Sequence, residues 1–119
     1  MKISFQKPPA DILLWFLTHR LWMYLKVHRS ADGNEVVAVC DRELLNTSVR
    51  RGDLEVCISE KFYGNRLSEP EEVRPLLEKA DNINLMGERV VALAIEMGLI
   101  DRTNFIMFGT VPHAQVIRI

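Results

Sequence analysis

The sequence predicts an α+β fold, a two-layer sandwich in which an antiparallel or mixed sheet of about five strands carries two main helices on one face. Two observations predict it. Strand-like alternation of apolar and polar residues opens and closes the regular part of the chain, and two segments with helical apolar spacing lie between. The chain has 119 residues, 48% of them hydrophobic, which is enough to bury a core of its own.

The N-terminal segment, residues 1–22, stands apart from this pattern. Its apolar run at 12–17 is far shorter than the roughly 20 residues that a membrane-spanning helix needs. Asp11 interrupts the hydrophobic region and no small-residue cleavage site follows, so a secretory signal is a poor match. Two interpretations stay open: a short helix that docks on the body or contacts a partner, or an upstream-start artefact with Met23 as the genuine start. We expect residues 23–119 to form a single α+β domain.

A β-hairpin opens this domain. Two alternating segments, 24–29 and 35–40, flank an Asp-Gly pair at 32–33, and Asp-Gly is a strong signal for a two-residue hairpin turn. That register places Leu25 opposite Cys40. The second segment is apolar on both faces, which predicts a central strand.

Shorter elements follow the hairpin. Residues 41–45 predict a helical turn with Asp41 as its N-cap. The polar residues 46–53 predict a loop, the alternating residues 54–58 a strand, and residues 59–66 a compact loop that carries two aromatic side chains.

Two helices come next. The first runs from Ser68 to Ala80 with one apolar stripe, and Pro75 inside it predicts a kink. For the second helix we expect either Asn82 or Asn84 as the cap, with a glycine in the first turn.

The chain returns to the sheet at its end. The second helix is expected to end at Gly98. A strand at 104–108 and a turn at 109–110 then lead into a terminal strand at 111–119, in which Pro112 fixes the entry of the chain.

Charge and cysteine content exclude several classes of function. The formal net charge is −1, which argues against a protein with a long polyanion track but leaves room for a local basic patch. Cys40 and Cys57 are isolated thiols, typical of a reduced, cytoplasmic protein. The spacing of His and Cys residues predicts no metal site, and no cofactor motif is present.

Several runs of residues resemble an archaeal family known as domain of unknown function 424. The runs are Asn84–Arg89, Ala94–Ile100, Val111–Val116, Ser59–Gly64, and Asp41 with Glu43 and Leu44. The resemblance covers roughly residues 23–119 and leaves residues 1–22 outside. It implies a small, cytoplasmic archaeal α+β protein associated with translation genes, and it brings no settled activity.

Two features near the C-terminal half are candidates for a pocket. His113 follows a proline that would hold it in one orientation, as a general acid/base or a ligand needs; alternatively, it ties the terminal strand to its neighbour. Asn84, Gly87 and Glu88 mark a helix start whose N–H groups could bind an anion, or which is simply capped. Together they predict a small enzyme or ligand-binding protein.

The preferred hypothesis is a non-enzymatic binding module that contacts RNA or a ribonucleoprotein. Aromatic rings interleaved with basic side chains can stack bases and hold phosphates. The candidate residues are Phe62, Tyr63, Arg50, Arg51 and Arg66, with Lys61 close in sequence. The alternative is that Phe62 fills the core and the arginines are a solvated surface. An oligomer subunit without a site of its own is a third hypothesis, and no catalytic residue is predicted.

Overall fold

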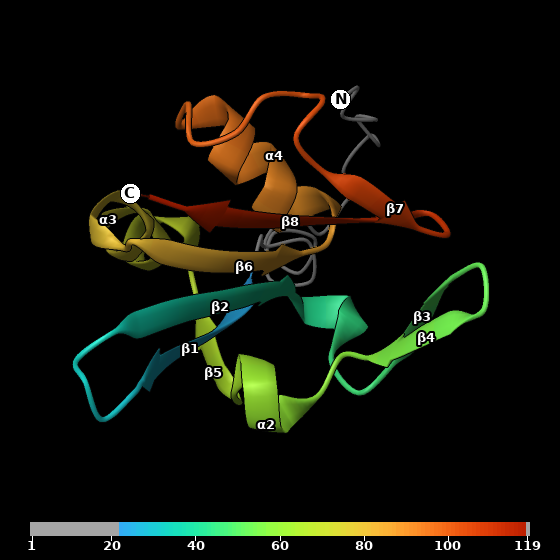
Figure 1. The fold of residues 1–119 in the computed structure, drawn as a ribbon, viewed down its shortest axis with the longest axis horizontal. Helices are drawn as coiled ribbons and strands as arrows, with labels where there is room; N and C mark the ends of the chain where they lie inside the picture. The colour runs from blue at the N-terminus through green and yellow to red at the C-terminus, as the bar shows by residue number, and fades with distance from the viewer. Residues whose placement is uncertain (1–21, 119) are drawn as a thin grey trace, which may run out of the picture.

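One mixed sheet organises the molecule (Figure 1). The computed structural model describes residues 22–118, so the interpretations of residues 1–21 and the expected role of Ile119 lie outside the described residues. The strand order is β5-β1-β2-β6-β8-β7, with β2 and β6 parallel and the other neighbours antiparallel. The strands are β1 (Met23–Arg29), β2 (Glu35–Asp41), β5 (Arg66–Ser68), β6 (Asn82–Met86), β7 (Ile106–Phe108) and β8 (Val111–Ile117).

Two main helices pack on one face of this sheet, which confirms the predicted fold class. They are α3 (Pro70–Lys79) and α4 (Glu88–Glu96). Their apolar stripes share one core cluster with alternate residues of the central strands. Because side chains alternate across a strand, the remaining residues of those strands point to the opposite face. The shared cluster includes Leu25, Val39, Val73, Leu77, Ile83, Leu85, Val90 and Val91.

The opposite face is also covered. A short helix, α2 (Glu60–Tyr63), and a two-stranded hairpin, β3 (Ser48–Arg51) with β4 (Leu54–Cys57), lie over it. A second cluster forms there from Ala38, Cys40, Val49, Ile58, Tyr63, Met86 and Phe108. The sheet therefore separates two apolar clusters, and the smaller elements determine what the second face exposes.

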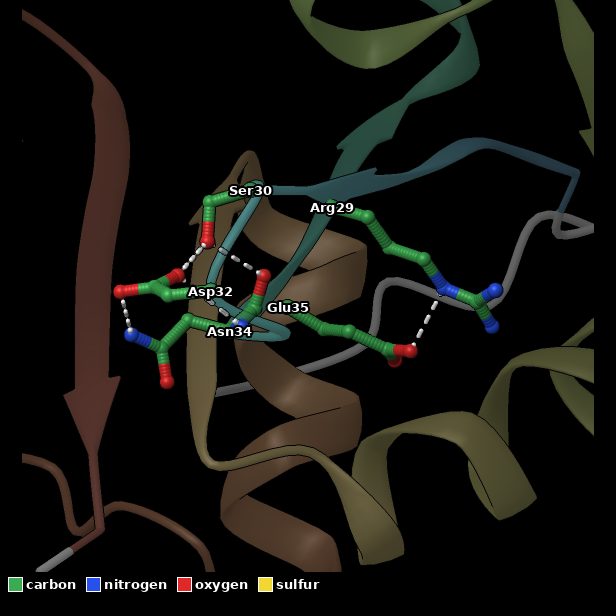
Figure 2. Close-up of polar contacts among 5 residues, drawn as sticks. All are labelled: Arg29, Ser30, Asp32, Asn34 and Glu35. Carbon is green, nitrogen blue, oxygen red and sulfur yellow. Dashed lines mark hydrogen bonds and ion pairs between the residues drawn. The ribbon is translucent and has the colours of Figure 1, made fainter.

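The first hairpin has a longer turn than predicted. Figure 2 shows the Ser30 hydroxyl and the Asn34 amide donating to the two carboxylate oxygens of Asp32, while Arg29 and Glu35 pair at 2.7 Å where β1 ends and β2 begins. Five residues, 30–34, thus form the turn instead of two.

The longer turn shifts the register by one residue. Leu25 lies opposite Val39, so the predicted pairing of Leu25 with Cys40 is wrong. Leu25 and Val39 both pack under α3 and α4, whereas Cys40 belongs to the cluster on the other face. A one-residue slip exchanges the two faces of a strand, which is why this turn matters for the core.

Two segments predicted as loops contain regular structure. The polar stretch 46–53 includes β3, which pairs with β4 and buries its one apolar residue, Val49. In the segment 59–66, the Ser59 hydroxyl accepts the N–H of Phe62 at 3.3 Å and caps α2. The predicted helical turn after β2 is confirmed as a 3-10 turn at Arg42–Leu44.

The two main helices begin later than the sequence suggested. The prediction that Asn82 or Asn84 caps the second helix is wrong, because both residues lie in β6 between β2 and β8. Gly87 occupies the N-cap position of α4. The first helix starts after a capping box of Glu69 and Glu72 and continues through Pro75. No helix within residues 22–118 is long and apolar enough to cross a membrane.

Candidate functional site

A buried carboxylate from β2 holds the start of α4. Asp41 is 2% exposed, and its two oxygens accept the backbone N–H groups of Arg89 and Val90, each at 3.0 Å. Those N–H groups lie in the first turn of α4, where backbone N–H groups have no acceptor within the helix itself. Asp41 therefore acts as the cap of a helix 48 residues away, while its side chain makes no capping bond to the 3-10 turn that follows it.

Gly87 makes room for this carboxylate. A Cβ at position 87 would lie 2.3 Å from Cγ of Asp41, and the φ of Gly87 is +121°, which side chains disfavour. The N–H of Gly87 donates to the carbonyl of Pro112 at 2.9 Å. The close backbone approach that a glycine permits thus joins three segments: the end of β2, the start of α4 and the start of β8.

The environment of Asp41 is acidic. Burial raises the pKa of Asp41 to about 6, although the N–H groups of Arg89 and Val90 act to lower it. Glu43, which raises it further, pairs with Arg89 at 2.6 Å. A small pocket of about 200 Å³ lies here, and its lining includes the three acidic residues Asp41, Glu43 and Glu88. The N–H groups expected to attract an anion are taken by Asp41, and residues 22–118 contain no group of three metal-ligating side chains.

His113 lies beside this helix start. In β8, His113 lies opposite Met86 of β6, and Met86 is the residue before Gly87. Its Nδ1 donates to the carbonyl of Leu85 at 2.8 Å, and its ring meets Phe108 edge-on. Burial lowers the pKa of His113, so the neutral imidazole is favoured. The structure therefore brings His113 and Gly87 together.

Asn84 has a different role. Its Oδ1 accepts the hydroxyl proton of Tyr63 at 2.6 Å, which ties β6 to α2 across the second apolar cluster. Burial raises the pKa of Tyr63, so its hydroxyl stays protonated and able to donate. Asn84 is thus a half-buried strand residue whose side chain holds α2, and it does not cap the helix start that the sequence assigned to it.

The two aromatic side chains of α2 are divided between core and surface. Tyr63 is 4% exposed and fills the second cluster, the role that the alternative interpretation gave to Phe62. Phe62 is half-buried: it packs against the same cluster, in part as the alternative expected, and it stacks on His28 with 4.9 Å between ring centres. The Nε2–H of His28 donates to the carbonyl of Phe62 at 2.7 Å, which fixes the stack against β1.

The three arginines of the predicted basic surface are spread apart. Arg50 pairs with Glu55 within the β3–β4 hairpin, and Arg51 donates to the carbonyl of Met107 in β7. Arg66 lies in β5 at the opposite edge of the sheet. Five strand intervals of about 4.8 Å separate β5 from β7, roughly 24 Å in all. The structure does not bring Arg66 and the other two arginines onto one surface.

A basic hollow lies instead where α2 and β5 meet β1, and we call it the basic pocket. Its volume is about 640 Å³, and its lining residues are Leu25, Lys26, Val27, Glu60, Lys61, Gly64, Asn65 and Arg66. Lys26 donates to the carbonyl of Lys61 at 2.8 Å, and the Asn65 amide donates to Glu60 at 3.0 Å. Sequence reasoning missed Lys26, whose only signal was its place beside His28 on one face of an alternating strand.

Comparisons with known proteins agree with this fold. A family model described as protein of unknown function (DUF424) matches residues 28–119. The crystal structure of an uncharacterized conserved protein from Methanopyrus kandleri is similar, with a TM-score of 0.68 and 26% identity. That similarity covers 82% of this chain and 94% of the other. No curated protein matches the chain.

Proposed function

This chain belongs to the DUF424 family, and we propose that it is a non-enzymatic binding module whose partner is RNA or a ribonucleoprotein. The resemblance indicated by the sequence motifs is confirmed by the family match, which covers most of the chain. The observation that carries the proposal is the basic pocket, where Lys26, Lys61 and Arg66 line one hollow.

The charges of this pocket favour a phosphate ligand. Lys26 and Lys61 form no ion pair with any residue of the described range 22–118, while Arg66 shares its charge with Glu72 at 3.1 Å. Ammonium groups without a carboxylate partner are available to a phosphate, and phosphate contacts supply most of the sequence-independent affinity for nucleic acids. The half-buried stack of Phe62 on His28 belongs to the same two elements, α2 and β1, although neither residue lines the pocket.

A small enzyme or ligand-binding protein is the second candidate. One observation favours it: the Gly87 N–H donates to the carbonyl of Pro112 at 2.9 Å. His113 follows Pro112 in the chain and therefore lies beside the start of α4. Against it, both oxygens of the Asp41 carboxylate already accept N–H groups of α4. The Nδ1–H bond of His113 to Leu85 fixes the ring tautomer and leaves Nε2 as the ring atom that would have to reach a substrate.

Two charge-reversal variants of the full chain test the preferred proposal. The first, Lys26→Glu with Lys61→Glu, changes the basic pocket. The second, Arg50→Glu with Arg51→Glu, makes the same change of charge far from the pocket. We expect the wild-type protein and the second variant to co-purify with nuclease-sensitive RNA at low salt, and the first variant to lose it.

Circular dichroism and thermal unfolding are the controls that check whether both variants are folded. The proposal fails if the wild-type protein retains no nucleic acid, or if the two variants lose RNA equally. Equal losses would mean that overall charge, and not the basic pocket, controls binding.

A further inference from the structure

We infer that the basic pocket receives one nucleotide unit of single-stranded RNA and not the face of a duplex. This inference depends on the proposed RNA-binding function and names the form of RNA that the pocket fits. Three features of the pocket carry it: its concave shape, the unpaired strand edge beside it and the small number of available cations.

The shape of the pocket suits a single unit of an open strand. Its volume of about 640 Å³ is large enough for one nucleotide unit, and the hollow is open to solvent on one side, so a strand could enter it. Gly64 brings the loop after α2 close to β1. A Cβ added to Gly64 would lie 3.1 Å from the carbonyl oxygen of Leu25 and 3.1 Å from Cβ of Lys26. A duplex presents a convex, stacked surface, whereas an unpaired nucleotide can turn out of its strand and enter a hollow.

The edge of β1 offers groups that can read a base. All seven residues of β1 pair with β2, but β5 pairs only with Met23–Leu25. Figure 1 shows β1 continuing past β5 toward the turn, and no strand of the described chain lies on the outer side of Lys26–Arg29. In an antiparallel pair every second residue directs its N–H and C=O away from its partner. Those groups can donate to and accept from the edge of an unpaired base.

Only a few phosphates can be neutralised here. Lys26 and Lys61 have no carboxylate partner among residues 22–118, Arg66 has one in Glu72, and Glu60 adds a negative charge to the lining. Two or three phosphate contacts are therefore expected. For single strands, log K falls against log salt by roughly 0.7 per neutralised phosphate, so the expected slope is about −1.4 to −2.1.

Binding of labelled RNA to the full chain, followed by fluorescence anisotropy, tests this. The probes are a ten-nucleotide single strand, an RNA hairpin with the same number of phosphates whose loop is replaced by a non-nucleotide linker, and AMP as a competitor. We expect the single strand to bind at least about tenfold tighter than the hairpin, with a salt slope near −2. AMP should compete only weakly, because it lacks the neighbouring phosphates.

A pocket-filling variant separates the pocket from the surface around it. Asn65→Trp fills the hollow without changing charge, and Leu54→Trp is the matched control at an exposed position, 56% accessible, on β4. We expect Asn65→Trp to weaken single-strand binding about tenfold or more and Leu54→Trp to leave it unchanged.

The outcomes distinguish this inference from the proposed function. If hairpin and single strand bind equally and both depend on Lys26 and Lys61, the RNA-binding module stands and the single-strand inference is overturned. An unaffected Asn65→Trp variant, a salt slope steeper than about −5, or AMP binding as tight as the oligonucleotide also overturns it. If no RNA binds at all, both the single-strand inference and the proposed RNA-binding function fail.

Discussion

The start of α4 and the basic pocket both gather polar side chains, but their hydrogen bonds go to different places. At the start of α4, Asp41 satisfies two backbone N–H groups and fills the space that Gly87 leaves open. In the basic pocket, Lys26 and Lys61 line a hollow and find no carboxylate partner in the described part of the chain. The polar groups of the first region are satisfied within the protein, whereas the lysines of the second face solvent, although the first region has the more conspicuous sequence motif.

The largest effect should come from closing the space at Gly87. We expect Gly87→Ala to lower the free energy of unfolding by about 4 kcal/mol or to prevent folding, because its Cβ would overlap the buried Asp41 carboxylate at a strained φ. Urea denaturation measures this. Gly33→Ala is the control, since φ is +89° there but no atom lies within 4 Å of the added Cβ; about 1 kcal/mol is expected. Similar losses in the two variants would mean that the contact with Asp41 is unimportant.

A smaller effect should appear in the pH dependence of stability. Burial raises the pKa of Asp41 from 3.8 to about 6, so between these values the folded state binds more protons than the unfolded state. Stability from this group is therefore present at low pH and lost as the pH rises through 6. Relative to Asp41→Asn, the wild-type protein should gain about 2 kcal/mol between pH 7.5 and pH 4.

The comparison with Asp41→Asn removes the contribution of His113. Its pKa is lowered by burial, so it acts in the opposite direction and costs stability as the pH falls below about 6.5. His113 is present in both proteins, and its effect cancels in the difference. A difference between the two proteins that stays constant with pH would show that Asp41 does not titrate as its burial implies.

The smallest effect on stability should come from the basic pocket. Lys61→Glu changes an exposed side chain with no ion pair inside residues 22–118, so the free energy of unfolding should change by less than about 0.5 kcal/mol. Urea denaturation beside the RNA-binding assay measures both properties of the same variant. A loss of 2 kcal/mol or more would give Lys61 a structural role and remove the contrast between the two regions.

The elements with long, regular patterns could be predicted from the sequence. β2 is apolar on both faces and is central, and the helical stripes of α3 and α4 pack where one helical layer was expected. The elements that were missed are short ones, including β3, α2 and β6. β3 has a single apolar residue, so its pairing with β4 decides its conformation. β6 does alternate, with Ile83 and Leu85 buried, but its two asparagines suggested helix caps instead.

The candidate sites were predictable to a lesser degree. The sequence suggested that His113 and Gly87 are neighbours, and the structure places them together. It could not show that Asp41 already occupies the N–H groups of α4, because that contact spans 48 residues of chain. It also could not bring Lys26 to Lys61 or separate Arg66 from Arg50, since both depend on the order of strands in the sheet.

The capping of α4 by Asp41 has a consequence for the order of folding. Closing a contact across 48 residues costs chain entropy, so the first turn of α4 gains its cap only when β2 and β6 have paired. During synthesis from the N-terminus, Asp41 leaves the ribosome well before Arg89. The Asp41 carboxylate is therefore already outside the ribosome when α4 emerges, and α4 can receive its cap before β8 has joined the sheet.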